Sequence, residues 1–299
     1  MLERVRISLF VVCATIFSLY GACACAAAPE EIFRIARPSM TKLAAVNSEG
    51  RTFFGTAVAL PDGRLVTNCH VTQLAQRVYL MSGDATATAH SQSDDVARDL
   101  CVISVPDFKF RPATQRSSSS LKVGEAVVAV GFNHGLGLTY QTGQVTGLFE
   151  HDGAYVIQTN AAFAKGASGG GLFDADGSLV GILSFVRVEN GRDFFYFALP
   201  LEWLGSGAGE KPIGPLAGTP FWAETPERQP LFMRAAQLET DARWVELIAV
   251  AREWSARSPA DGQAWFSLGK ALRNSGDTDA AREAFRRAAE FGVLQSSMP

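Results

Sequence analysis

The sequence predicts a mainly β protein that ends in a small α-helical region. Two short apolar runs, 55–60 and 65–71, flank a Pro-Asp-Gly turn at 61–63, and a third run spans 100–105. Apolar, β-branched runs bounded by turn residues are typical of β-strands. From about Leu231 the apolar period changes to 3.6 and Ala, Leu, Arg and Glu become common, which predicts helices.

Length and composition set broad limits on the class of protein. With 299 residues, of which 47% are hydrophobic and 19% charged, the chain can bury one full domain and a small second one. The formal net charge of -3 and the lack of a dense Lys/Arg run give no support for nucleic-acid binding.

The N-terminus has the pattern of a secretory signal peptide. A cationic start at 1–6 precedes an apolar core at 7–20 and small residues at 21–28. A cut after Ala26 fits the A-x-A cleavage pattern. We therefore predict a signal peptide over residues 1–26 and an exported protein, either periplasmic or secreted.

Two alternatives to cleavage stay open at this end. The uncharged stretch 7–28 is long enough to span a bilayer if it is retained. The residues ending at Cys23 also faintly resemble a lipoprotein processing site, although the usual leucine is missing. A membrane association is expected only in these two cases.

The most informative motif is the glycine-rich run 166–171, G-A-S-G-G-G, with Ser168 at its centre. The spelling G-x-S-x-G fits the nucleophile elbow of α/β-hydrolases, but in that fold the acid and the histidine follow the serine. Here all four histidines, at positions 70, 90, 134 and 151, precede Ser168. Chain order therefore excludes the elbow and leaves the order His, Asp, Ser of chymotrypsin-type proteases.

His70 and Asp99 are the histidine and acid with suitable surroundings. His70 ends the predicted hairpin, and Asp99 directly precedes the apolar run 100–105, whereas the other histidines lie in polar or glycine-rich sequence. A serine becomes a good nucleophile when an imidazole takes its proton and a buried carboxylate fixes the imidazole tautomer. We predict His70, Asp99 and Ser168 as the catalytic residues.

Longer segments around these residues resemble bacterial trypsin-like serine proteases of the HtrA/DegP type. The matching segments are 67–71 (T-N-C-H-V), 98–103 (R-D-L-C-V-I) and 158–170 (Q-T-N-A-A-F-A-K-G-A-S-G-G), and shorter matches extend the resemblance from about residue 38 to residue 204. The chain departs from the family pattern at Cys69, Asn160, Ala167 and Gly171, none of which removes a catalytic group.

The resemblance implies a fold, an activity and further site residues. It implies two six-stranded antiparallel β-barrels in a protease domain at 30–204, acting on protein or peptide substrates without a cofactor. The backbone amides of Gly166 and Ser168 would form the oxyanion hole. The substrate pocket would involve Ala162, Phe163 and Ser184, and the absence of an acidic residue at 160–163 predicts small or apolar side chains at P1.

Two cysteines, Cys69 and Cys101, remain after the predicted cleavage. Because they flank His70 and Asp99, they lie close together if the triad forms. A disulfide suits an exported protein, but two buried free thiols are an equal alternative, since sequence does not give the Cα separation. A zinc site formed with His70 is not supported, because no C-x-x-C spacing is present.

The C-terminal part divides into a Gly/Pro-rich linker at 205–228 and a helical region at 229–299. One helical unit has the spacing of a tetratricopeptide repeat, abbreviated TPR. Its positions are Trp265, Leu268, Gly269, Leu272, Gly276, Ala281, Phe285 and Ala288. The region is expected either to pack on the protease or to bind a partner or another copy, and no PDZ-like segment is recognised. A catalytically silent scaffold that acts through these helices is the alternative function.

Overall fold

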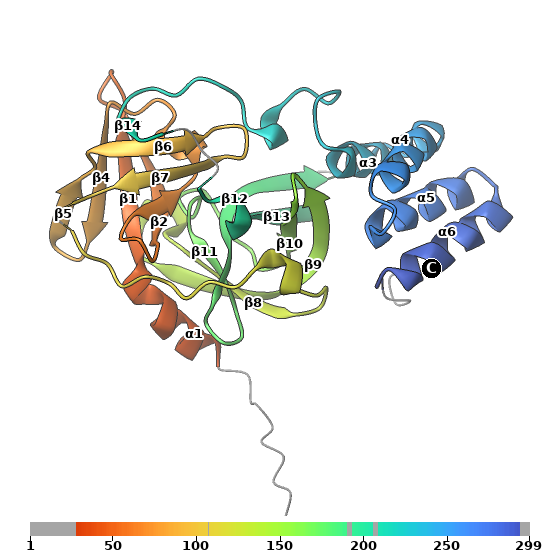
Figure 1. Cartoon of the computed structure of the whole chain (residues 1–299), viewed down its shortest axis with the longest axis horizontal. Coiled ribbons are helices and arrows are strands. Elements are labelled where there is room, and N and C mark those ends of the chain that lie inside the picture. The colour runs from red at the N-terminus through yellow and green to blue at the C-terminus, as the bar shows by residue number, and fades with distance from the viewer. Residues whose placement is uncertain (1–27, 107, 190–192, 206–208, 294–299) are drawn as a thin grey trace, which may run out of the picture.

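The computed structural model describes residues 28–106, 108–189, 193–205 and 209–293. Two β-sheet units lie side by side, and four helices pack beside the second unit (Figure 1). The predicted signal peptide at 1–26 lies outside the described residues. Among the helices that are described, none combines the length and the apolar character needed to cross a bilayer.

The first unit is a curled eight-stranded sheet. Its strands are β1 (Met40–Val46), β2 (Thr52–Ala59), β3 (Leu65–Thr67), β4 (Arg77–Ser82), β5 (Ala85–Thr88), β6 (Ser91–Asp95), β7 (Leu100–Ser104) and β14 (Lys211–Pro212). They are ordered β14-β6-β7-β3-β2-β1-β4-β5, so that β5 and β14 are the two edges. The predicted hairpin is confirmed: β2 and β3 pair in antiparallel register on either side of the 61–63 turn.

The second unit is a closed antiparallel barrel of six strands. These are β8 (Ala126–Gly131), β9 (Thr139–His151), β10 (Ala154–Thr159), β11 (Gly171–Asp174), β12 (Leu179–Glu189) and β13 (Asp193–Pro200). The predicted mainly β, trypsin-like fold class is confirmed, with the refinement that only the second sheet closes on itself while the first remains a curled half-barrel.

The helices are short at the start of the chain and longer at its end. They are α1 (Pro29–Ala36), the single turn α2 (Cys69–Thr72), α3 (Leu231–Thr240), α4 (Trp244–Arg257), α5 (Gly262–Asn274) and α6 (Thr278–Glu290). A Cβ on Gly269 of α5 would lie 2.7 Å from the Phe285 ring of α6, so these two helices approach closely at this glycine. Whether the unit is a TPR by function stays a prediction.

The helical region packs onto the second barrel. Phe232 of α3 stacks on Phe149 of β9 with 4.7 Å between ring centroids, and the Arg187 guanidinium on β12 donates to the Met233 carbonyl at 2.8 Å. One cluster of buried apolar residues runs from the barrel into the helices. Of the two expectations for this region, packing on the protease is therefore observed.

The segment predicted as a linker packs against the protease domain. After residue 209 the chain adds β14 to the edge of the first sheet, then crosses back toward α3 along the side where the two sheets meet (Figure 1). Leu216 and Phe221 of this segment are buried. We refer to residues 209–229 as the strap.

Candidate active site

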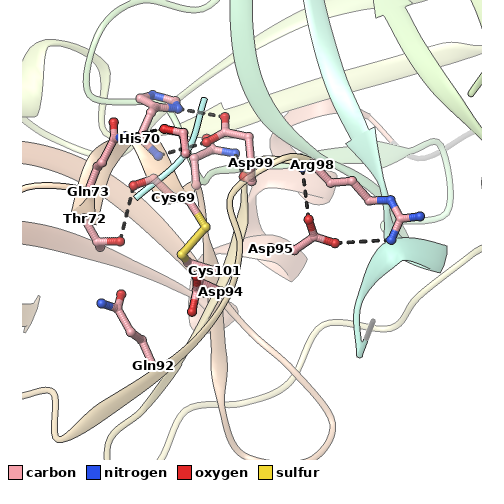
Figure 2. Close-up of a disulfide and its surroundings, with 12 residues drawn as sticks. Cys69, His70, Thr72, Gln73, Gln92, Asp94, Asp95, Arg98, Asp99 and Cys101 are labelled. Carbon is pink, nitrogen blue, oxygen red and sulfur yellow. Dashed lines mark hydrogen bonds and ion pairs between the residues drawn. A yellow bond between two sulfur atoms is a disulfide. The ribbon is translucent and has the colours of Figure 1, made fainter. Parts of the chain in front are cut away.

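Pairing of two adjacent strands brings His70 and Asp99 together. β3 pairs with β7, and Thr67 lies opposite Cys101 in that register. His70 follows β3 in α2, and Asp99 directly precedes β7. The imidazole Nδ1 lies 2.7 Å from Asp99 Oδ2, and the backbone N–H of His70 donates to Asp99 Oδ1 at 2.9 Å (Figure 2).

Asp99 is held in an unusual backbone conformation. Its φ of 59° lies in the left-handed region, which non-glycine residues rarely adopt. Its carbonyl accepts hydrogen bonds from Asn68 Nδ2 at 3.0 Å and from the Cys69 backbone N–H at 3.3 Å. Because Asn68 and Cys69 directly precede His70, these hydrogen bonds fix the backbone of Asp99 relative to that of His70.

Cys69 and Cys101 form a disulfide across the same pair of segments (Figure 2). Their Cα atoms are 4.9 Å apart, and both residues are fully buried beside Val96 and Leu216. Of the two alternatives that the sequence left open, the disulfide is the one observed. It ties the residue before His70 to the strand that begins directly after Asp99.

The carboxylate of Asp99 is fully buried and accepts from several donors. Besides His70, the Ser184 hydroxyl donates to Oδ2 at 2.6 Å and the Trp222 indole N–H donates to Oδ2 at 3.2 Å. A buried carboxylate needs such donors because it has lost its hydration. Together with His70 Nδ1, three donors therefore converge on one oxygen.

Ser168 belongs to the loop between β10 and β11 of the second barrel and faces the first sheet. Its carbonyl accepts from the Thr56 N–H of β2 at 2.8 Å, which fixes the loop against that sheet. Its hydroxyl donates to the Ser184 carbonyl at 3.3 Å, and among the described residues it has no hydrogen bond to the His70 ring. Ser184 thus links the predicted nucleophile to Asp99.

Gly166 and Gly169 allow this loop to pack without side chains. Gly166 has a φ of 96°, and a Cβ there would lie 2.5 Å from the Phe132 carbonyl oxygen. Gly169 has a φ of 83°, and its Cβ would lie 2.1 Å from the Thr56 carbonyl oxygen. Both positions require glycine because of the backbone conformation and because of these close approaches.

Two backbone N–H groups of the loop, those of the predicted oxyanion hole, have no protein acceptor among the described residues. The carbonyl of Lys165 accepts from the His134 N–H at 2.6 Å. In the peptide between Lys165 and Gly166 the N–H points opposite to the carbonyl, so the Gly166 N–H points away from His134. Within the described part of the chain, neither the Gly166 nor the Ser168 N–H donates to a protein group. Unpaired backbone donors are what an oxyanion hole requires, and their role here stays a prediction.

The three predicted pocket residues have different environments. Ala162 is half-buried, whereas Phe163 is 8% exposed and packs on Tyr196 in the apolar core of the second barrel. Ser184 directs its hydroxyl to Asp99. A role in substrate binding stays a prediction for all three residues.

Sequence reasoning missed Trp222, which touches both members of the histidine–aspartate pair. Its ring also lies edge-on to the imidazole of His70, with 5.5 Å between centroids and an interplanar angle of 90°. The available signal was the Phe221-Trp222 pair, because two adjacent aromatic residues are unusual in a solvated Gly/Pro-rich linker and indicate a buried segment.

A comparison with protein families identifies the class. Residues 55–182 match the trypsin-like peptidase domain, and this range contains His70, Asp99 and Ser168. The fold and this match together indicate a peptidase domain of the trypsin-like class.

Individual relatives narrow the class further. Protease Do-like 1 of the Arabidopsis thaliana chloroplast is 35% identical over 158 residues, which cover 48% of this chain and 36% of the relative. The periplasmic serine endoprotease DegP of Escherichia coli K12 is 31% identical over 154 residues, covering 49% and 32%. The chain thus spans about a third of the length of these relatives.

Solved structures agree with this relationship. The HtrA-type protease AlgW with a tripeptide has 28% identity and a TM-score of 0.54, with 59% of this chain and 60% of that chain covered. A protease of M. tuberculosis in its active form has 20% identity and a TM-score of 0.55, covering 62% and 88%, and shares the fold. The protease part of the chain is therefore similar to serine proteases of the HtrA/DegP type.

Proposed function

We propose that this chain is an exported serine endopeptidase that hydrolyses peptide bonds through His70, Asp99 and Ser168. The observation that carries the proposal is the buried Asp99 carboxylate bonded to His70 Nδ1 at 2.7 Å. The loop that carries Ser168 is bonded to the same sheet through the Ser168 carbonyl. Export is supported by the signal-peptide pattern and by the periplasmic location named for the DegP relatives.

The proposed reaction proceeds through an acyl-enzyme. Ser168 Oγ attacks the carbonyl carbon of the substrate while His70 Nε2 takes the hydroxyl proton, and Asp99 stabilises the resulting imidazolium. The N–H groups of Gly166 and Ser168 bind the oxyanion. His70 then returns the proton to the leaving amine, and a water molecule repeats the sequence to release the acid product.

The hydroxyl of Ser168 must leave its bond to the Ser184 carbonyl in order to donate to His70. That bond is 3.3 Å long, near the outer limit of a hydrogen bond, so the rearrangement costs little. The second candidate, a silent scaffold acting through its helices, is favoured by the lack of a hydrogen bond from Ser168 to the His70 ring among the described residues, because a serine without its base is a poor nucleophile.

Labelling with a fluorophosphonate probe distinguishes the two functions. The probe is expected to label the wild-type chain and not Ser168→Ala, while Ser119→Ala, which changes an exposed serine, keeps full labelling. Absence of labelling in a folded wild-type chain would support the scaffold. A peptide library then tests the predicted preference for small or apolar P1 residues, which cleavage mainly after Arg or Lys would contradict.

A further inference from the structure

The strap is fastened to the first sheet on both sides of the histidine–aspartate pair. The Leu216 N–H donates to the Gln73 carbonyl at 2.8 Å, and Gln73 Nε2 donates back to the Gly218 carbonyl at 2.9 Å. The Phe221 N–H donates to the Ala97 carbonyl at 2.8 Å. These bonds reach three residues beyond His70 and two residues before Asp99, so Trp222 is placed beside the pair by its own backbone.

Trp222 is held by contacts of its ring, its indole N–H and its carbonyl. Its ring stacks on Phe185 of β12, with 5.3 Å between centroids and an interplanar angle of 15°. Its carbonyl accepts from Gln229 Nε2 at 3.2 Å, which folds the end of the strap back on itself. The indole is therefore held between the second barrel and His70 with its N–H directed at Asp99.

Asp99 depends on protein donors because its carboxylate is fully buried. Asp99 has no exposed surface, and its Oδ2 accepts the hydrogen bond from His70 Nδ1. Each remaining donor to a buried carboxylate fixes its position and stabilises its charge. Ser184 supplies one such donor from the second barrel, and Trp222 supplies the other from the strap.

We infer that Trp222 is a positioning residue of the active site, acting on His70 through Asp99, and that the strap completes the site. The inference rests on the proposed peptidase function. It makes the segment after the protease domain part of the machinery, independently of any partner that the helices bind. Loss of the indole N–H is expected to slow chemistry without weakening substrate binding.

The test uses the full-length chain with Trp222→Phe, which keeps an aromatic ring against Phe185 and removes the N–H donor. Trp265→Phe is the matched control. The Trp265 N–H also donates a hydrogen bond, in this case to the Pro259 backbone carbonyl at 2.8 Å, but the residue lies in the helical region. Cleavage of the best fluorogenic peptide from the library and the labelling rate with a small fluorophosphonate are measured, and thermal melts report folding.

For Trp222→Phe we expect kcat to fall about tenfold with KM within about twofold, since a misplacement of about 1 Å costs about 100-fold and two other donors still hold Asp99 Oδ2. The labelling rate should fall by the same factor, normalised to the folded fraction. Trp265→Phe should match wild type in both rates.

Two results would overturn the inference. One is a Trp222→Phe variant with wild-type kcat and labelling rate. The other is a rise in KM at unchanged kcat, which would make Trp222 a substrate contact. Failure of the proposed function is a separate outcome, because the wild-type chain itself would then neither label nor cleave.

Discussion

The two halves of the candidate site are built by different means. The first sheet contributes His70 and Asp99 through side chains, which are joined by a charged hydrogen bond and backed by the Cys69–Cys101 disulfide. The second barrel contributes Ser168 on a loop held by main-chain hydrogen bonds and by glycines packed against carbonyl groups. The first half is thus sensitive to charge and covalent linkage, and the second to backbone shape.

Removing the charge of the first half should have the largest effect. Asp99→Asn keeps the shape but presents an amide to Nδ1, which favours the wrong imidazole tautomer, so kcat should fall by about 10⁴-fold. Asp95 lies four residues before Asp99 and forms an ion pair with Arg98. The kcat of Asp95→Asn should stay within about threefold of the wild-type value. Peptide cleavage measures both, and similar losses in the two variants would remove the distinction between this carboxylate and its neighbours.

Altering the backbone of the second half should have the next largest effect. Gly166→Ala puts a Cβ 2.5 Å from the Phe132 oxygen and must displace the loop, so loss of an oxyanion donor is expected to lower kcat about 100- to 1000-fold. Gly124→Ala is the matched control, since Gly124 also has a positive φ, 92°, but has open space around it.

The control should lose about 1 kcal/mol of stability and no activity. If Gly166→Ala stays as active as Gly124→Ala, the loop tolerates a side chain, and the prediction that the Gly166 N–H binds the oxyanion is wrong. Circular dichroism of both variants establishes that they are folded, so that the comparison concerns the loop alone.

Sequence predicted these two halves unequally. The 55–71 hairpin and the apolar run after Asp99 located the first half, because strand patterns determine where strand ends lie. Chain order and the glycine-rich run located Ser168. The pairing of Cys69 with Cys101 stayed open, since spacing along the chain does not give a Cα separation.

What the sequence did not predict are contacts between distant segments. Ser184 was expected in a pocket wall, and its bond to Asp99 depends on how the second barrel meets the first sheet. Trp222 lies 123 residues from Asp99, in a segment whose Gly and Pro content is typical of a linker. Only tertiary packing determines that such a segment lies across the site.

The disulfide tests how much of the first half is held covalently. Replacing both cysteines, Cys69→Ala with Cys101→Ala, opens a loop with a sequence separation of 32 residues and should lower the free energy of unfolding by about 3 to 4 kcal/mol. Denaturant unfolding of wild type with and without reductant provides the control. A loss below about 1 kcal/mol would mean that hydrogen bonds alone hold His70 and Asp99 together.

The smallest effect is expected far from both halves, at the start of α5. Burial raises the pKa of Asp261 from 3.8 to about 6, while the N–H groups of Gln263 and Ala264 oppose the shift. The folded chain then binds this proton more tightly than the unfolded chain does. The stability that this contributes is full below about pH 4 and is lost as pH rises through about 6.

Asp261→Asn keeps a side-chain oxygen at this N-cap and removes the buried charge. It should raise the free energy of unfolding by roughly 2 kcal/mol at pH 7 and change it little at pH 4. The free energy of unfolding should therefore depend less on pH between these two values. Asp277→Asn is the matched control, because Asp277 caps α6 through the Ala280 N–H from an exposed position, so its effect should stay within about 0.5 kcal/mol. Urea unfolding at the two pH values measures both variants. Equal changes in the free energy of unfolding for the two variants would mean that Asp261 is solvated.

Because neither cap contacts His70, Asp99 or Ser168, both variants should keep wild-type peptide cleavage. The stability of the helical region can thus be measured separately from the activity of the site.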